Sequence, residues 1–289
     1  EKEFPAIHFA SNRPDFSAAS YDPEYSSAAI YETEAGYADA VGTTRDYLSA
    51  AQNLGAELRF NANVVTVLQA GGRVTGVELV QDGTKSAVHA PVVVNCAGPW
   101  AAPLNRLAGV PLAYPFANIR AQMVNKSYSE ALPGHIPLVR DRVNNLYFRL
   151  EANGVQFHVG PNDPQDLMEN VDPDDYKDTA DPPLRERQLA MLQHRVPGLI
   201  ARGAVTTYAG LYCNYQLDNY PVLDHSELEG FVYAVGLGGE GFKMSPVVGM
   251  IVSHLVTGHI GRGSTRVPLN FFRKDREALL SVLWETQAL

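Results

Sequence analysis

The glycine-rich segment Gly236–Lys243 is the part of the sequence whose residue types and spacing point most directly to chemistry. Its glycines satisfy G-x-G-x-x-G, a pattern that lets a backbone approach the phosphates of a dinucleotide. A dinucleotide-binding unit also needs a second parallel strand that ends in an acidic residue about 20 residues further on. The sequence has Gly-His-Ile-Gly-Arg-Gly at 258–263 instead. The pattern therefore does not by itself predict a pyrophosphate site.

Two explanations of this segment remain. The glycines allow a strand and a helix to pack closely. Alternatively, the glycines let a flat ring system lie against the amides of a helix N-terminus and the Lys243 ammonium. These groups present positive charge, so they favour a ring that becomes negative on reduction.

Other reactive motifs are missing from the sequence. It contains no H-E-x-x-H, no paired C-x-x-C and no nucleophile elbow, so we expect no metal site and no hydrolase chemistry. Cys96 and Cys213 match no metal spacing, and we expect both to be reduced, buried thiols in a cytoplasmic protein. The net charge of −9 disfavours binding to nucleic acids or membrane surfaces. No apolar run is long enough to span a bilayer.

The elements around the glycine-rich segment follow from hydrophobic periodicity. A buried strand over 230–235 precedes the segment, and a helix follows that starts with Ser245 as N-cap and Pro246. Apolar residues lie nearly all round this helix, so we expect it to be buried. Near the other end, a helix over 43–54 begins at Thr43 or Thr44. The strands predicted after it are a three-stranded meander over 63–68, 73–81 and 86–89, and a strand over 91–98 buried on both faces.

Residues 112–204 are predicted to form a second unit. Strands over 146–150 and 155–159 flank a turn at 151–154, which is typical of a hairpin. An Asp- and Pro-rich stretch over 162–183 is expected to be an exposed excursion, and a helix over 184–195 follows it. Residues 1–33 show weak periodicity and are interpreted as an irregular segment.

Five collinear segments carry a resemblance to the D-amino-acid oxidase, glycine oxidase and sarcosine oxidase superfamily. They are Glu34–Asp39, Gly72–Val77, Val93–Trp100, the stretch from Ala209 to Leu223, and Val235–Pro246. The resemblance implies an α/β fold with an FAD/NAD(P)-binding-type sheet and helices, plus an antiparallel-sheet substrate domain. The discontinuous FAD-binding part would take 34–111 and 205–289, and the substrate domain 112–204. The family's N-terminal βαβ unit, expected to be missing here, would account for roughly a hundred residues.

The resemblance also implies a non-covalently bound FAD. The expected loss of the βαβ unit leaves two alternatives open, a truncated chain that binds FAD and one that lacks it. Val64 would touch the adenine through its backbone, Ala97 and Gly98 would line the cofactor's path, and Gly238, Gly239, Glu240, Gly241, Phe242 and Lys243 would hold the isoalloxazine. Sarcosine oxidases have their flavin-linking cysteine where Leu211 stands, so we predict no covalent link.

Residues for substrate and catalysis follow from the same resemblance. Lys243 would face a substrate carboxylate, and His158 aligns with a lysine that activates oxygen in sarcosine oxidases. Tyr147 and Arg149 occupy alternate positions of the partner strand and would line the same pocket. Tyr212 stands where other members place a carboxylate-binding arginine.

The activity implied is oxidation of the C–N bond of a small-molecule amine, N-methylated amino acid or amino acid by hydride transfer to flavin N5. Two alternatives remain. The chain is the larger piece of a nicked or two-chain flavoenzyme that needs an N-terminal fragment or another subunit. Otherwise it is a non-catalytic truncated relative that binds a partner or a small ligand.

Overall fold

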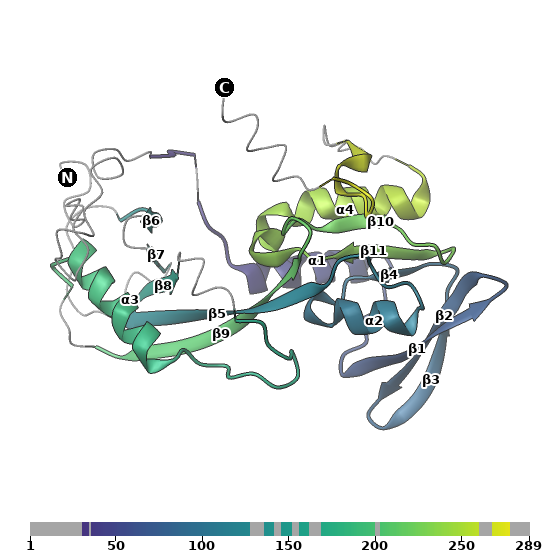
Figure 1. Ribbon diagram of the computed structural model, residues 1–289, viewed down its shortest axis with the longest axis horizontal. Coiled ribbons are helices and arrows are strands. Elements are labelled where there is room, and N and C mark those ends of the chain that lie inside the picture. The colour runs from purple at the N-terminus through teal and green to yellow at the C-terminus, as the bar shows by residue number, and fades with distance from the viewer. Residues whose placement is uncertain are drawn as a thin grey trace. The chain divides into compact units, whose positions relative to one another are not determined.

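The computed structural model describes residues 31–34, 36–127, 136–141, 146–151, 156–161, 169–199, 203–259 and 268–277 (Figure 1). The chain divides into two compact units. Unit 1 comprises Glu1–Tyr37 and Ile119–Leu211, and unit 2 comprises Ala38–Asn118 and Tyr212–Leu289. The fold is mixed α/β, as the sequence predicts. No helix in these described ranges combines the length and the apolar character that a membrane span requires.

A three-stranded sheet forms the centre of unit 2. Its middle strand, β11 (Phe231–Val235), is buried at all five residues, which confirms the predicted buried strand. It pairs antiparallel with β10 (Val222–His225) and parallel with β4 (Val93–Asn95). The prediction that the 91–98 strand is buried on both faces is wrong, because β4 lies at the edge of this sheet and only Asn95 is buried.

The predicted meander is confirmed. Strands β1 (Ala62–Ala70), β2 (Arg73–Gln81) and β3 (Thr84–His89) pair antiparallel in sequence order. Both turns have two consecutive residues with positive φ, Gly71 and Gly72 in one and Asp82 and Gly83 in the other. Such turns match the right-handed twist of a hairpin, so this local chemistry sets the register.

Helix α1 (Ala40–Asn53) begins earlier than predicted. Its N-cap is Asp39, whose carboxylate accepts a hydrogen bond from the Val41 amide at 3.0 Å. Thr43 and Thr44 are therefore not caps. Their hydroxyls donate to the carbonyls of Asp39 and Ala40, each at 2.8 Å. A short helix α2 (Ala101–Leu107) follows the 3₁₀ turn η2 (Gly98–Trp100).

Helix α4 (Gly241–Thr257) also begins earlier than predicted, so Ser245 is not its N-cap and Pro246 lies inside it. A proline there has no amide to donate to the carbonyl four residues earlier, which belongs to Phe242. The Ser245 hydroxyl donates to that carbonyl at 2.9 Å and replaces the missing bond. Gly258, in the left-handed region at φ +70, ends the helix.

The prediction that α4 is buried all round is wrong. Ile251 is its only buried residue, packed in a cluster with Leu223, Ala234 and Phe272, the last from the 3₁₀ turn η5 (Leu269–Phe272). Helix α1 buries none of its residues. Helices α1 and α4 of unit 2 therefore present apolar side chains outward.

Unit 1 is built on a five-stranded sheet with the order β6-β7-β8-β5-β9. The predicted hairpin is confirmed by the antiparallel pairing of β7 and β8, although residues 152–155 of its turn lie outside the described residues. Helix α3 (Pro182–Arg195) packs on one face and confirms the predicted helix. The strands are β5 (Phe116–Ser127), β6 (Val139–Asp141), β7 (Leu146–Leu150), β8 (Gln156–Pro161) and β9 (Val205–Tyr215).

The side chains of one sheet face form the core of unit 1. Phe148, Phe157, Val159 and Val124 are fully buried together with Leu192 of α3. Because side chains alternate along a strand, the residues between them point to the opposite face. That opposite face carries Tyr147, Arg149 and His158.

The described part of the Asp- and Pro-rich stretch is largely exposed, as predicted, but it is also anchored to the sheet. The guanidinium of Arg120, whose side chain is 3% exposed, lies 2.7 Å from Glu169 and 2.9 Å from Asp181 and also donates to the carbonyls of Lys177 and Thr179. One buried cation thereby fastens residues 169–181 to β5. Residues 162–168 of this stretch lie outside the described residues.

Candidate functional site

The glycine-rich loop connects β11 directly to α4 through the 3₁₀ turn η4 (Gly238–Glu240). Gly236 and Gly238 have φ of +74 and +54. A Cβ on Gly236 would meet Tyr215 Cβ at 3.0 Å, and one on Gly238 would meet Asn214 Oδ1 at 2.4 Å. These glycines therefore let the loop pack against β9, which supports the packing explanation of the motif.

Tyr212 lies at the same loop. A Cβ added to Gly239 would meet the Tyr212 ring at 3.2 Å, so the phenol ring covers the backbone of that glycine. The structure thus brings a predicted substrate residue into contact with a predicted cofactor residue. The next residue, Cys213, is buried, and burial raises its pKa to about 11. Cys96 is exposed, which corrects the expectation that both thiols are buried.

The amino end of α4 carries no side-chain cap. Its N-cap residue is Glu240, and the carboxylate does not accept from the helix amides but forms an i,i+3 ion pair with Lys243. The first-turn N–H groups thus have no side-chain cap from Glu240, and a helix presents partial positive charge at this end. The side chain of Lys243 is 64% exposed, so the structure shows a paired, solvated ammonium here.

The turn that carries Ala97 and Gly98 is held by one buried side chain. Asn95 donates from Nδ2 to the Ala101 carbonyl at 3.0 Å and to Asn105 Oδ1 at 2.8 Å. Its Oδ1 accepts from the Ala97 amide at 2.9 Å. Gly98 follows with φ +53, and no atom lies within 4 Å of where its Cβ would be. The turn is therefore rigidly anchored on one side and open at Gly98.

Val64 lies beside an irregularity of the meander. It pairs with Leu79, but the next paired residue on β1 is Thr66, so Val65 has no partner on β2. A β-bulge disrupts the ladder locally and leaves backbone groups available for other hydrogen bonds. The residue left unpaired is Val65, the neighbour of Val64, and the adenine contact through the Val64 backbone stays a prediction.

The open face of the unit 1 sheet brings Tyr147, Arg149 and His158 together. Arg149 of β7 is the direct cross-strand partner of His158 of β8. Arg149 donates from Nη1 to the Tyr147 hydroxyl, and the rings of Tyr147 and His158 meet edge to face with centroids 6.0 Å apart. The sequence prediction that these three residues share a face agrees with this arrangement.

Four further residues belong to this polar face and were missed by the sequence analysis. Asn125 Oδ1 lies 3.1 Å from His158 Nδ1, and Glu151 Oε1 lies 3.0 Å from Arg149 Nη2. The Tyr37 ring lies under the Arg149 guanidinium at 4.8 Å. The ring of Tyr208 on β9 lies 5.9 Å from that of His158. We call these seven residues the polar face of unit 1.

His158 is uncharged at neutral pH. Burial lowers its pKa to about 4, and the nearby Arg149 cation adds to the effect. The imidazole therefore carries no positive charge with which to bind an anion. Arg149 is the one cation among the seven residues.

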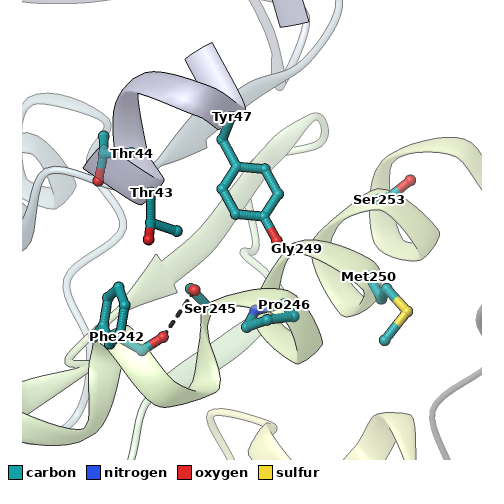
Figure 2. A pocket seen from close by; sticks show the side chains of 9 residues that line it. All are labelled: Thr43, Thr44, Tyr47, Phe242, Ser245, Pro246, Gly249, Met250 and Ser253. Atoms are coloured by element: carbon teal, nitrogen blue, oxygen red, sulfur yellow. Dashed lines mark hydrogen bonds between the residues drawn. The ribbon is translucent and has the colours of Figure 1, made fainter. Parts of the chain in front are cut away.

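A separate pocket of about 730 Å³ lies between α1 and α4 (Figure 2). The Tyr47 side chain extends from α1 toward α4, where Phe242, Pro246 and Met250 line the pocket. Of the residues predicted for cofactor or substrate, only Phe242 lines it. The small residues Ser245, Gly249 and Ser253 recur every four positions on the α4 side, which leaves this face of the helix shallow.

Comparison with known proteins decides the family. The family model described as FAD dependent oxidoreductase (DAO) matches residues 12–255. The chain belongs to this family. Relatives include human mitochondrial sarcosine dehydrogenase, 26% identical over 236 residues, which cover 78% of this chain and 25% of that protein. The monomeric sarcosine oxidase of Streptomyces avermitilis is 26% identical over 276 residues, covering 89% of this chain and 65% of its own length.

Solved structures share the fold. L-proline dehydrogenase from P. horikoshii superposes with a TM-score of 0.67 at 23% identity, covering 82% of this chain and 60% of that one. Glycine oxidase from Bacillus cereus gives a TM-score of 0.61 at 18% identity, covering 74% and 55%. The chain therefore spans less than two thirds of the length of each of these relatives and solved structures.

The residues present fit part of the family's FAD. The uncapped amino end of α4 suits a ring that gains negative charge, and the bulge beside Val64 suits a hydrogen-bonding purine edge. The open space at Gly98 leaves room beside the anchored turn. In the sequence, G-x-G-x-x-G occurs once, in the loop at 236–241. A Cβ added to any of its three glycines would meet other residues of the protein, so the open side of these glycines is already filled and offers no space to a phosphate. The fit therefore holds for the flavin ring and the adenine rather than for the phosphates.

Proposed function

We propose that this protein oxidises the C–N bond of an amine, an N-methylated amino acid or an amino acid, with hydride transfer to flavin N5. The single observation that carries the proposal is the junction of β11 and α4, where a glycine loop, an uncapped helix N-terminus and Tyr212 lie together. FAD, when bound, supplies the hydride acceptor. The residues of this chain bind and position the substrate and stabilise the charge that develops.

The chain's own part is electrostatic and positional. The α4 amides and the Lys243 ammonium stabilise negative charge that develops on the acceptor side. The polar face of unit 1 offers donors and aromatic surface to hold a small polar substrate. Because the His158 imidazole is uncharged, it takes part as a neutral hydrogen-bonding group.

The experiment is a visible absorption spectrum of the purified chain before and after addition of FAD and desalting. Retained flavin is then mixed anaerobically with sarcosine, N,N-dimethylglycine, L-proline or glycine, and bleaching reports reduction. We expect Lys243→Met to slow the reduction about 10-fold or more. Lys85→Met is the matched control, because Lys85 is also an exposed lysine of unit 2 paired with a glutamate. Retained flavin that none of these substrates bleaches would overturn the proposal.

A second candidate function follows from the exposed surface of unit 2. We propose that α1, α4 and the edge strand β4 receive a nucleotide-binding βαβ unit, so that the active enzyme needs this unit in addition to the described residues. The support is that α1 buries no residue, α4 buries only Ile251, and the apolar pocket between them is large enough for side chains of a packed helix.

Complementation tests this second candidate. The chain is mixed with a separately expressed nucleotide-binding segment of a family member, and FAD uptake is compared with that of each part alone. We expect uptake only in the mixture, and Met250→Glu in the pocket should abolish it. Equal FAD uptake with and without the segment would contradict the candidate. A chain that takes up no FAD in either case would point to a binding role instead.

A further inference from the structure

We propose that Arg276 is a positioning residue: by fixing the turn at 215–220 it sets the conformation of the glycine-rich loop at which the flavin ring would bind. This inference rests on the proposed function, because that function places the ring at the loop. It makes the segment 268–277, which follows the loop and its helix in the sequence, part of the machinery of the site. Arg276 acts there through the turn.

The guanidinium of Arg276 is held by hydrogen bonds on several sides. Nε and Nη2 donate to the two carboxylate oxygens of Asp218 at 2.9 and 2.7 Å, which is a bidentate pair. Nη2 also donates to the Tyr220 carbonyl at 3.0 Å, and Nη1 donates to the Arg273 carbonyl at 2.9 Å. The side chains of Arg276 and Asp218 are 5% and 0% exposed. A buried fork of this kind fixes both the distance and the orientation of its partner.

The turn that Arg276 holds has a conformation that needs support. Asn219 lies in the left-handed region at φ +62, which a residue with a Cβ adopts only at some cost in free energy. The Asn219 amide donates to the Tyr215 carbonyl at 2.8 Å, and the Tyr220 amide donates to Asp218 Oδ1 at 3.0 Å. The Arg276 guanidinium also lies over the Tyr215 ring at 5.6 Å. Arg276 therefore contacts both ends of the turn.

The glycine-rich loop packs directly on this turn and on the strand before it. A Cβ on Gly236 would meet Tyr215 Cβ at 3.0 Å. A Cβ on Gly238 would meet Asn214 Oδ1 at 2.4 Å and would lie 3.9 Å from the Asn219 carbonyl. The space between loop and turn does not accept even one methyl group, so a shift of the turn has to move the loop.

The position of the loop matters for the chemistry because the loop leads into the uncapped amino end of α4. Amides at this end stabilise negative charge on a bound ring only if they point at it. Small displacements of such donors reduce their effect strongly. Arg276 therefore contributes to the charge stabilisation of the proposed function through the geometry of the loop.

Anchoring of the segment 268–277 alone does not require Arg276. Phe272 is 4% exposed and packs in the cluster that contains Ile251 of α4. The Lys274 amide donates to Asp224 Oδ2 at 3.2 Å. These contacts fasten the segment to β10 and α4 independently. The bonds from Arg276 to Asp218 are directed at the turn instead.

The test is hydrogen–deuterium exchange of the purified chain without flavin, followed by mass spectrometry of its peptides. We expect Arg276→Met to accelerate exchange of the peptides that cover 212–220 and 236–242 by about 10-fold or more, the factor for loss of a charged hydrogen bond from a local opening. Leu79→Ala is the stability control, because this buried residue of β2 in the same unit lowers global stability by a comparable amount. Arg273→Met is the local control, at an exposed pair.

Two further variants keep the test decisive if Arg276→Met folds poorly. Arg276→Lys retains the charge without the fork and should accelerate the same peptides to a smaller extent. The double variant Asp218→Leu with Arg276→Met removes both charges, so global stability is regained. Exchange of the loop should nevertheless stay fast in this double variant, because the bonds that hold the turn are gone. Thermal melting curves give the global stability of each variant.

Riboflavin supplies a second measurement, since it presents the flavin ring without pyrophosphate or adenine. Its binding is followed by the change in its fluorescence. We expect Arg276→Lys to weaken binding about 10-fold, as for the loss of a charged hydrogen bond, and Arg273→Met to leave it unchanged.

The outcomes separate this inference from the proposed function. Loop exchange in the Arg276 variants that is no faster than in Leu79→Ala at the same melting temperature would overturn the positioning role. Riboflavin binding that is equal in Arg276→Lys and in the unmodified chain would also overturn it. Faster loop exchange in the Arg276 variants, together with retained flavin that no amine bleaches, would leave the positioning role standing and remove the proposed function.

Discussion

Replacing Asn95 with alanine should destabilise unit 2 through the turn that carries Ala97 and Gly98. The Asn95 side chain is fully buried and makes three hydrogen bonds, to the Ala97 amide, the Ala101 carbonyl and Asn105 Oδ1. Alanine fills none of these positions. Asn105 is itself buried, and its Nδ2 already has no hydrogen-bond partner within the described residues. When Asn95 is removed, Asn105 Oδ1 therefore loses its donor as well.

The magnitude follows from the number of bonds. A buried hydrogen bond contributes about 1 kcal/mol net, so three lost bonds reduce the free energy of unfolding by about 3 kcal/mol. For a domain of this size each kcal/mol shifts the melting temperature by about 2–4 °C, which gives a decrease of about 6–12 °C.

Thermal unfolding followed by circular dichroism measures this decrease. Asn63→Ala is the matched control, because Asn63 is exposed on β1 and should change the free energy of unfolding by less than about 0.5 kcal/mol. A melting temperature for Asn95→Ala within about 2 °C of that of the unmodified protein would refute the reasoning. It would mean that the three hydrogen bonds contribute almost nothing to the free energy of unfolding.

Three further predictions concern titration, reactivity and a buried ion pair. NMR titration should place the His158 pKa at about 4, below that of an unfolded histidine. The contribution of this residue to the free energy of unfolding is therefore complete above about pH 6.5 and is lost as the pH drops to about 4. His158→Gln should remove that part of the pH dependence. Cys96 should react with a thiol reagent in the native protein, whereas Cys213 should react only on unfolding; equal rates would contradict the burial of Cys213. Arg276→Met leaves the buried Asp218 carboxylate without its bidentate partner and should lower the free energy of unfolding, measured by urea denaturation, by about 3–5 kcal/mol. Arg273→Met, at an exposed ion pair, should lower it by about 1 kcal/mol or less.

Strands and turns of this fold were predictable because their signals are local. The apolar run Phe231–Val235 identifies a strand with both faces covered, and the Gly71–Gly72 and Asp82–Gly83 pairs accept the positive φ that hairpin turns need. The same logic failed for β4. The run Val92–Val94 is apolar, but β4 lies at the edge of its sheet, and a strand's own sequence does not encode its position within a sheet.

Helix starts were less predictable because more than one residue can serve as a cap. Asp39 and Thr43 both have suitable side chains, and the apolar spacing begins too late to choose between them. In α4, Pro246 is typical of a first turn. The helix continues upstream of it, and there the Ser245 hydroxyl replaces the amide that proline lacks, a hydrogen bond that sequence patterns do not indicate.

The candidate site was predicted where its residues are close in sequence. Tyr147 and Arg149 alternate on one strand, so their common face follows from strand geometry alone. Asn125 and Tyr37 were missed because they reach the same face from other parts of the chain. Asn125 meets His158 through the register of β5 with β8, and Tyr37 lies more than a hundred residues from Arg149. Register between distant strands is set by tertiary packing, which a single sequence does not specify.

The division of the chain into units has a consequence for the order in which it folds during synthesis. The main segment of unit 1, Ile119–Leu211, is continuous, and it interrupts unit 2 between Asn118 and Tyr212. The core of unit 2 joins Val67 and Val74 to Tyr215, Phe231 and Tyr233, residues that leave the ribosome well over a hundred positions later. Strand β4 likewise has to wait for β11, its parallel partner. The segment Ala38–Asn118, the first half of unit 2, therefore emerges early with β4 unpaired, and the sheet of unit 1 forms before β11 is available to pair with it.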